Sequence, residues 1–476
     1  MVVQHNMQAA NANRMLNVTT SAQSKSTEKL SSGYRINRAA DDAAGLTISE
    51  KMRKQIKGLD RASTNAEDGV SAVQTAEGAL TEVHSMLQRM NELATQSANG
   101  TNSNTDRKAI QDEIDQLTTE IDRVSETTKF NETYLLKGDG AEKEHNVNAH
   151  DAGLDGVTLT DKGDKVEVTL KELKAGDKIS IAGKNYTIGG TSDDVDTLLK
   201  AANITGADGD KVTINGTEYT YYENAVGGDA LTNKGFYATQ PKAADKASAK
   251  PDYADLDAIK NAKNSTITAG GKSVTTMGNV TDGVDDKDSS VITAKKAYML
   301  ETAEILKASG IGADKAPTAT GNDALDAATN KFSLTKGKVN YNDALSFNLH
   351  VGADADMTNK ITVNIDSMNS AGLGVKGIKA DTEQDATYAI DAIADAISTV
   401  SSQRSALGAV QNRLEHTINN LDNVVENTTS AESRIRDTDM AEEMVNYSKN
   451  NILAQAGQSM LAQANQSNQG VLSLLQ

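Results

Sequence analysis

The chain has 476 residues, too many for one compact core, so its length predicts several domains. A formal net charge of -18 disfavours nucleic acid and anionic membrane surfaces as partners. Aromatic residues make up 3% of the chain and cysteine is absent, which excludes disulfides and thiolate chemistry. The N-terminus lacks the pattern of a cleavable signal peptide, and no stretch approaches the roughly 20 apolar residues of a membrane span.

The two ends of the chain, residues 1–32 and 440–476, are rich in Gln, Asn, Ala and Ser. Each end carries only a sparse apolar stripe and buries too little surface to offset the entropy lost on ordering. We therefore expect both ends to be disordered in the free chain and helical when packed against copies of themselves. The stripes consist of Met7, Met15, Val18, Met460, Ala464, Val471, Leu472, Leu474 and Leu475.

Two amphipathic helices are predicted after the first end, because apolar residues recur at steps of three and four. The polar run at residues 99–104 ends the first helix and offers N-caps for the second. The first apolar face is Ala66, Val70, Val73, Ala76, Leu80, Val83, Leu87, Met90 and Leu93. The second is Ile110, Ile114, Leu117, Ile121 and Val124.

The middle of the chain, residues 139–340, is predicted to be an α+β insert. Residues 177–188 and 210–221 repeat one pattern, with Ala-Gly and Asn-Gly at a central turn, and residues 265–274 form a weaker third copy. Such dipeptides between alternating residues predict β-hairpins. Residues 194–202 and 295–309 are predicted to be short helices. After the insert, alternation at 345–351 and 361–365 predicts a hairpin packed on the helical flanks.

A regular heptad pattern marks the second helical flank and predicts a long coiled-coil helix. Arg404 and Gln411 interrupt its apolar seam, and we interpret them as residues that specify register rather than catalysis. The seam is Ala386, Ile390, Ile393, Ile397, Val400, Arg404, Leu407, Gln411, Leu414, Ile418, Leu421 and Val425.

Motifs for enzyme chemistry are missing from the sequence, which has no H-E-x-x-H, Walker loop or G-x-S-x-G. His145 and His150 are the one close histidine pair, and a solvated loop is favoured over a metal site. The acidic run at residues 282–288 lacks the Gly and Glu positions of a calcium loop and is interpreted as an exposed turn. We therefore predict no catalytic residue, no cofactor and no bound metal.

Several motifs at both ends resemble those of the bacterial flagellins. Residues 29–48 read KLSSGYRINRAADDAAGLTI, with NANR at 11–14 and LATQSANGTN at 93–102. Near the other end, residues 430–441 read SAESRIRDTDMA, followed by QANQ at 463–466 and VLSLL at 471–475. The resemblance covers about residues 1–138 and 341–476, and the insert does not take part in it.

This resemblance implies a mainly α fold: a discontinuous coiled-coil and helical-bundle rod built from both termini, plus a β-hairpin, with an inserted α+β outer domain. Residues 1–44 and 440–476 would form the inner core of a filament, 45–138 and 341–439 the rod, and 139–340 the surface-exposed insert. Residues 31–46 resemble the family's connecting segment, where Gly33, Gly45 and the Asp41-Asp42 pair suit turns. The function implied is that of a structural subunit that polymerises into a motility filament.

The family's partners follow from the same resemblance. They are further copies in a helical filament, an export chaperone, the flagellar secretion apparatus, and cap and junction proteins, and the chain would be exported unfolded to the extracellular flagellum. The residues assigned to chaperone binding and assembly are Met460, Val471, Leu472, Leu474 and Leu475. A host Toll-like innate receptor recognises the family, and the matching positions are Gln88, Arg89, Glu92, Leu93 and Glu113.

Three alternatives stay open at this stage. The chain could be a related rod, junction or hook-associated protein, although the motif near residues 30–46 favours a filament subunit. It could be a flagellin whose insert carries an enzyme, or a coiled-coil adhesin whose insert binds glycans or host proteins.

Overall fold

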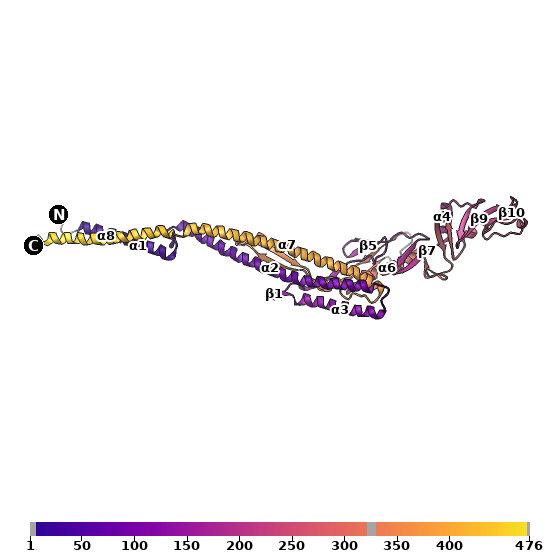
Figure 1. Ribbon diagram of the computed structural model, residues 1–476, viewed down its shortest axis with the longest axis horizontal. Coiled ribbons are helices and arrows are strands. Elements are labelled where there is room, and N and C mark those ends of the chain that lie inside the picture. Colours follow the sequence, from indigo (N-terminus) through magenta and orange to yellow (C-terminus); the bar gives the residue numbers. More distant parts are fainter. Residues whose placement is uncertain (1–5, 321–329, 474–476) are drawn as a thin grey trace. The chain divides into compact units, whose positions relative to one another are not determined.

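The computed structural model describes residues 6–320 and 330–473 (Figure 1). The chain divides into two compact units. Unit 1 contains Met1–Gln74, Ser346–Val363 and Leu407–Gln476, and unit 2 contains Thr75–Leu345 and Asn364–Ala406. The long helices α2 (Ala43–Ser97) and α7 (Glu383–Arg436) contribute residues to both units. The mainly α fold with a β-rich insert is thereby confirmed.

The two ends of the chain form a helix pair in unit 1, α1 (Met7–Ser32) and α8 (Met440–Ser473), which lie side by side (Figure 1). The Asn6 side chain caps α1 by accepting the N–H of Ala9 at 2.9 Å, and Gly33 ends this helix in the left-handed region at φ 76°. Asp439 caps α8 by accepting the N–H groups of Ala441 and Glu442.

The connection between α1 and α2 folds back onto the end of α7. The N–H of Arg35 donates to the carbonyl of Arg436 at 2.7 Å, and Asp42 caps α2 by accepting the N–H of Gly45 at 2.9 Å. The prediction of a turn at Gly45 is wrong, because this glycine lies in the first turn of α2. Its role is close packing, since a Cβ there would lie 2.7 Å from the Ile36 side chain.

The predicted hairpin after the insert is confirmed as β19 (Leu345–His350) and β20 (Lys360–Ile365), joined through η3 (Met357–Asn359). In unit 1 it packs on α2 and α7 through a core that contains Ala66, Ile361 and Leu414. Gly69 lets the hairpin approach, because a Cβ at that position would lie 2.2 Å from a methyl carbon of Leu349.

Helix α7 buries one face that repeats every seven positions, as the heptad predicts, and in unit 1 Leu414 on this face packs with Ala66 of α2. Within unit 2, Arg404 on α7 donates to Glu77 on α2 at 2.7 Å, which fits a residue that fixes register. Gln411 instead donates to Glu415 on its own helix at 2.9 Å. The buried α7 seam is Ala386, Ile393, Val400, Leu407, Leu414 and Leu421.

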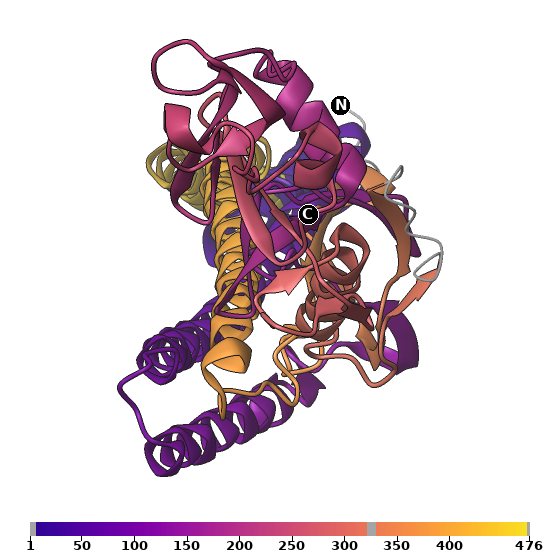
Figure 2. The ribbon, with the colours of Figure 1, turned by 90° about the vertical axis from the view of Figure 1, so that its right-hand side faces the viewer.

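Helix α3 (Asn104–Thr127) lies beside the C-terminal part of α2 in unit 2 (Figure 2). Ser103 and Asp106 form a capping box at its start, which confirms the predicted N-cap. Ile110, Ile114 and Ile121 are buried, as the spacing predicts, whereas Leu117 and Val124 are half-buried. The strands β1 (Lys129–Phe130) and β2 (Thr133–Tyr134) follow α3.

The insert begins and ends on one strand pair, β3 (Asp139–Asn146) and β18 (Lys338–Asp343). One sheet has the strand order β16 (Thr318–Thr320), β17 (Lys331–Thr335), β5 (Lys165–Thr169) and β4 (Thr158–Asp161). Another has the order β10 (Ala230–Tyr237), β9 (Thr217–Asn224), β8 (Lys211–Ile214), β11 (Ser265–Ala269), β12 (Lys272–Thr276), β7 (Lys184–Gly190), β15 (Val291–Ile292), β14 (Val284–Asp285) and β13 (Val280–Thr281), and β6 (Lys178–Ile181) pairs with β7. The helical elements are α4 (Ser192–Ala201), η1 (Ala243–Asp245), α5 (Leu256–Lys260) and α6 (Ala294–Ala308).

All three hairpins expected in the insert are present, as β6–β7, β8–β9 and β11–β12. Each turn has two residues at positive φ, for example Asn215 at 51° and Gly216 at 82°. The helices expected at 194–202 and 295–309 are also present, as α4 and α6. The α+β interpretation of the insert is therefore confirmed.

Two details of the insert correct the sequence analysis. His145 lies in strand β3 and stacks on Tyr341 with ring centroids 4.0 Å apart, so it is not in a solvated loop. Asp285 is buried and is not part of an exposed turn. Its burial works to raise its pKa, but the N–H groups of Gly278, Lys287 and Asp288 outweigh burial and hold this pKa below its ordinary value.

Candidate functional site

The helix pair α1–α8 has almost no core of its own. Among the described side chains of these two helices, only Ser26 and Ala454 are buried. Large apolar side chains instead face solvent, and a folded subunit rarely leaves so many on one element. They are Met7, Met15, Val18, Met440, Met444, Val445, Ile452, Leu453 and Met460.

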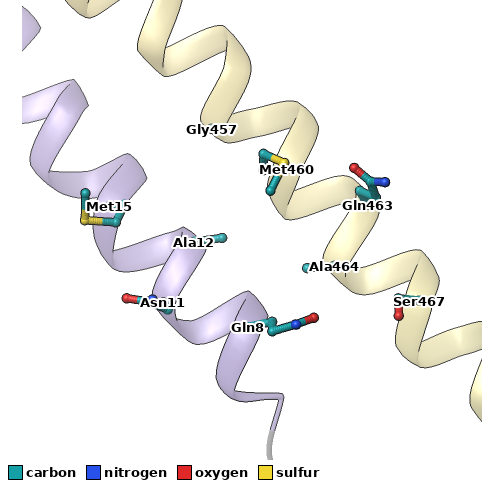
Figure 3. A pocket seen from close by; sticks show the side chains of 9 residues that line it. All are labelled: Gln8, Asn11, Ala12, Met15, Gly457, Met460, Gln463, Ala464 and Ser467. Carbon is teal, nitrogen blue, oxygen red and sulfur yellow. The ribbon is translucent and has the colours of Figure 1, made fainter.

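A groove of about 580 Å³ runs between the two helices (Figure 3). Ala12 of α1 and Ala464 of α8 point toward each other across it, and Met15 and Met460 line it from opposite helices. These four side chains are apolar, so they give the groove an apolar strip within a lining that also contains amide and hydroxyl groups. The lining residues are Gln8, Asn11, Ala12, Met15, Gly457, Met460, Gln463, Ala464 and Ser467.

Few specific contacts hold α1 and α8 together. The Asn6 side chain donates to the carbonyl of Ala464 at 3.2 Å, and Lys29 lies 3.8 Å from Glu443. Gly457 allows close approach, since a Cβ there would lie 3.3 Å from a methyl carbon of Leu16. Small residues bring the helices together without burying much apolar area.

Of the residues assigned to assembly, Met460 is 60% exposed and lies in the groove. Val471 and Leu472 fall in the last turn of α8, where the side chains are outside the described part. Leu474 and Leu475 lie outside the described residues.

The residues assigned to receptor recognition gather where α2 faces α3. Arg89 donates to Glu113 of α3 at 2.9 Å and to Glu92 at 3.2 Å, and these carboxylates raise the pKa of Arg89, Glu113 more strongly. Gln88 is also exposed. Leu93 does not belong to this surface, because its side chain is 2% exposed and packs in the core of the rod. We call Gln88, Arg89, Glu92 and Glu113 the Arg89 surface.

A residue that the sequence analysis missed organises the turn between α2 and α3. Arg107 is 8% exposed, and its guanidinium donates to the carbonyls of Ser97, Asn102 and Asn99 at 2.9, 2.9 and 3.0 Å. The guanidinium thus supplies donors to carbonyls at and just beyond the end of α2 that have no intrahelical donor, and the Asn99 carbonyl also accepts the N–H of Asn102 at 3.2 Å. Its position one turn inside a capping box was the only signal of this role.

A second missed residue is Arg436, at the end of α7. Its guanidinium donates to Glu50 at 2.8 Å and lies 4.7 Å from the ring centroid of Tyr34. Ser49 donates to Glu432 at 2.9 Å on the same stretch of α2 and α7. The contact of Arg436 with Tyr34 therefore joins the segments 29–48 and 430–441 in one junction, which Ser49 and Glu50 extend.

Within the described residues, no group of three or more His, Asp or Glu side chains could hold a metal ion. Nor does any helix among them have the length and hydropathy needed to cross a membrane. Glu301 of α6 is an isolated buried carboxylate, and desolvation raises its pKa to about 7.

The chain combines a long heptad helix, α7, with two terminal helices, α1 and α8, whose apolar side chains are exposed. This combination is typical of a structural subunit that assembles with copies of itself. Residues 3–141 match the model of the bacterial flagellin N-terminal helical region, and residues 390–475 match that of the C-terminal helical region. The chain belongs to the bacterial flagellins and is a structural subunit of the flagellar filament rather than an enzyme.

Full-length relatives support this assignment. A flagellin of Clostridium tyrobutyricum is 41% identical over 98% of this chain and 100% of its own length. Flagellin C of Vibrio cholerae is 35% identical over 99% of both chains, and polar flagellin A of Vibrio parahaemolyticus is 34% identical over the same share. The match therefore spans the insert as well as the helical flanks.

Proposed function

We propose that α1 and α8 become ordered as the subunit enters the filament, and that their burial between copies drives polymerisation. The supporting observation is the helix pair itself, in which only Ser26 and Ala454 are buried among the described side chains. Ordering one residue costs about 1–2 kcal/mol of backbone entropy, and a helix pair with so little buried surface does not offset that cost. Neighbouring copies would supply the missing apolar contacts.

The contacts proposed are heterologous, so that each copy presents one face and receives another. Such contacts do not close on themselves and generate an open helical polymer. The apolar groove with Met15 and Met460 is the part of the surface best suited to receive a neighbour.

The domain roles proposed follow the same division. Residues 1–44 and 440–476 would form the inner core, 45–138 and 341–439 the rod, and 139–340 the outer insert. The boundary at residue 440 coincides with the start of α8 at Met440, whereas the boundary after residue 44 falls within the first turn of α2.

A polymerisation assay with two deletions tests the proposal. A chain lacking residues 1–32 and 440–476 should stay monomeric under salting-out conditions in which the full chain forms filaments. The matched control removes residues 141–341, because the Asn342 side chain donates to the carbonyl of Gly140 at 3.1 Å and the two ends can be joined directly. The control should still assemble, and assembly of the chain without its ends would refute the mechanism.

Before assembly, exposed apolar ends need protection. We propose that an export chaperone covers α8, with Met460, Val471, Leu472, Leu474 and Leu475 as anchors. The flagellar secretion apparatus would then export the chain out of the cell, where it would meet cap and junction proteins. The exposed apolar side chains Met444, Val445 and Ile452 support a binding role for this helix. Chaperone binding should be lost on removal of residues 440–476 and kept on removal of residues 1–32.

A second role proposed is recognition by a host Toll-like receptor through the Arg89 surface. Arg89 is held by carboxylates from both α2 and α3, so the surface is preorganised and costs little entropy to bind. In receptor reporter cells, Arg89→Ala should lower activation by roughly tenfold or more, as loss of a central arginine does at many interfaces. Arg123→Ala is the control, because Arg123 is a comparably exposed residue paired with Glu120 on α3. Equal activation by the Arg89→Ala variant and the unaltered chain would refute this role.

A further inference from the structure

The two methionines that line the groove stand out for their chemistry as well as their position. Met15 and Met460 are 57% and 60% exposed and lie on opposite helices of the same groove (Figure 3). Three other methionines of the same two helices are also exposed but do not line the groove: Met7, Met440 and Met444. By contrast, Met90 and Met368 are fully buried. Since the chain has no cysteine and no tryptophan, exposed thioethers are its softest targets for an oxidant.

The reaction concerned is oxygen transfer from a peroxide to sulfur. The thioether sulfur attacks one oxygen of hydrogen peroxide, and an S–O bond forms as the O–O bond breaks. The hydrogen on the attacked oxygen passes to the other oxygen, which leaves as water. Sulfur loses two electrons and the peroxide gains them. The product is a methionine sulfoxide, which is polar and has a strong hydrogen-bond acceptor where an apolar group stood.

We propose that Met15 and Met460 form an oxidation site for peroxides that controls whether a subunit can join the filament. This inference rests on the proposed burial of α1 and α8 between copies. Where either residue packs against an apolar side chain of a neighbouring copy, a sulfoxide leaves an acceptor without a donor, and each such group lowers subunit affinity by roughly 5- to 150-fold. An oxidised subunit therefore does not add to the polymer, and reduction of the sulfoxides by a methionine sulfoxide reductase restores its addition.

Peroxide treatment of the full-length monomer, followed by peptide mass spectrometry and a polymerisation assay, tests the proposal. Met15 and Met460 should oxidise while Met90 and Met368 do not, and polymer yield should fall as these two sulfoxides accumulate. In preformed filaments the same two methionines should be protected from peroxide.

A methionine-to-leucine double variant separates these residues from other oxidisable sites. The variant Met15→Leu with Met460→Leu keeps similar apolar volume without sulfur. Both before and after peroxide treatment, it should polymerise as well as the untreated, unaltered chain does. The control variant Met299→Leu with Met357→Leu removes two exposed thioethers away from the terminal helices and should keep its sensitivity.

Retained sensitivity in the Met15/Met460 variant, or peroxide-treated unaltered monomer that polymerises normally, would overturn the proposal. If the double variant does not polymerise even without peroxide, the oxidised unaltered monomer is treated with a methionine sulfoxide reductase instead. Recovery of polymerisation when Met15 and Met460 are reduced supports the proposal, and reduction of both residues without recovery overturns it. The deletion of residues 1–32 and 440–476 tests the proposed assembly mechanism independently of peroxide. If that deletion abolishes assembly and peroxide has no effect, only the oxidation site is refuted.

Discussion

Replacing Arg107 by methionine should loosen the turn between α2 and α3 by about 2–3 kcal/mol. The side chain keeps its apolar stem but loses the donors for the carbonyls of Ser97, Asn99 and Asn102. Asn99 is exposed and Asn102 is half-buried, so water can replace the lost donor at both carbonyls. Ser97 is fully buried, and its carbonyl bears most of the cost, which is about 1–3 kcal/mol for an unsatisfied buried acceptor.

Hydrogen exchange is the appropriate assay, because a chain with several units has no single free energy of unfolding. Amides of α3 in the Arg107→Met variant should exchange roughly 30- to 150-fold faster than in the unaltered chain, which corresponds to this energy. Arg123→Met is the matched control, because Arg123 is exposed and pairs only with Glu120, so its loss should cost less than about 1 kcal/mol. Equal exchange of α3 amides in the Arg107→Met variant and the unaltered chain would refute the reasoning.

Three further predictions concern the insert and the rod. Gly176→Ala should destabilise the insert by more than about 2 kcal/mol in denaturant unfolding, because φ at Gly176 is +91° and a Cβ would lie 2.0 Å from the carbonyl oxygen of Ser273. The control Gly183→Ala should cost only about 1 kcal/mol, because φ there is +74° but the space around a Cβ is open. Glu301 has a folded-state pKa of about 7, above its ordinary value of 4.5, so the insert should lose about 3 kcal/mol of stability as pH rises from 4.5 through 7. In thermal melts, Glu301→Gln should abolish this part of the pH dependence. A double-mutant cycle on Arg404 and Glu77 should give a coupling energy of about 0.5–1 kcal/mol, because both side chains are partly exposed, and a coupling near zero would remove their role in register.

Patterns that depend on local geometry were predictable from the sequence. The Asn215-Gly216 turn must adopt positive φ at both residues, and this constraint is met wherever the dipeptide occurs between strands. The heptad around Leu407 and Leu414 likewise identifies the α7 seam, because one helix face repeats every seven residues whatever its partner is.

Features that depend on long-range packing were not predictable. Leu93 is an exception, because the helical spacing placed it on the apolar face while the resemblance placed it on a recognition surface, and its burial confirms the spacing. Asp285 and Glu301 are charged residues in polar segments, and only the tertiary contacts of β14 and α6 bury them. The role of Arg107 arises because carbonyls from the last residue of α2 and from the following turn converge on it, and its position near a capping box does not by itself indicate that convergence.

Hydrogen exchange at residues 7–32 and 440–473, compared between dilute monomer and filament, tests most directly whether the ends gain their structure from neighbouring copies. The amides of both helices should exchange within seconds in the monomer and become strongly protected in the filament, while α2 and α7 stay protected in both states. Strong protection of both ends in the isolated monomer would contradict the account.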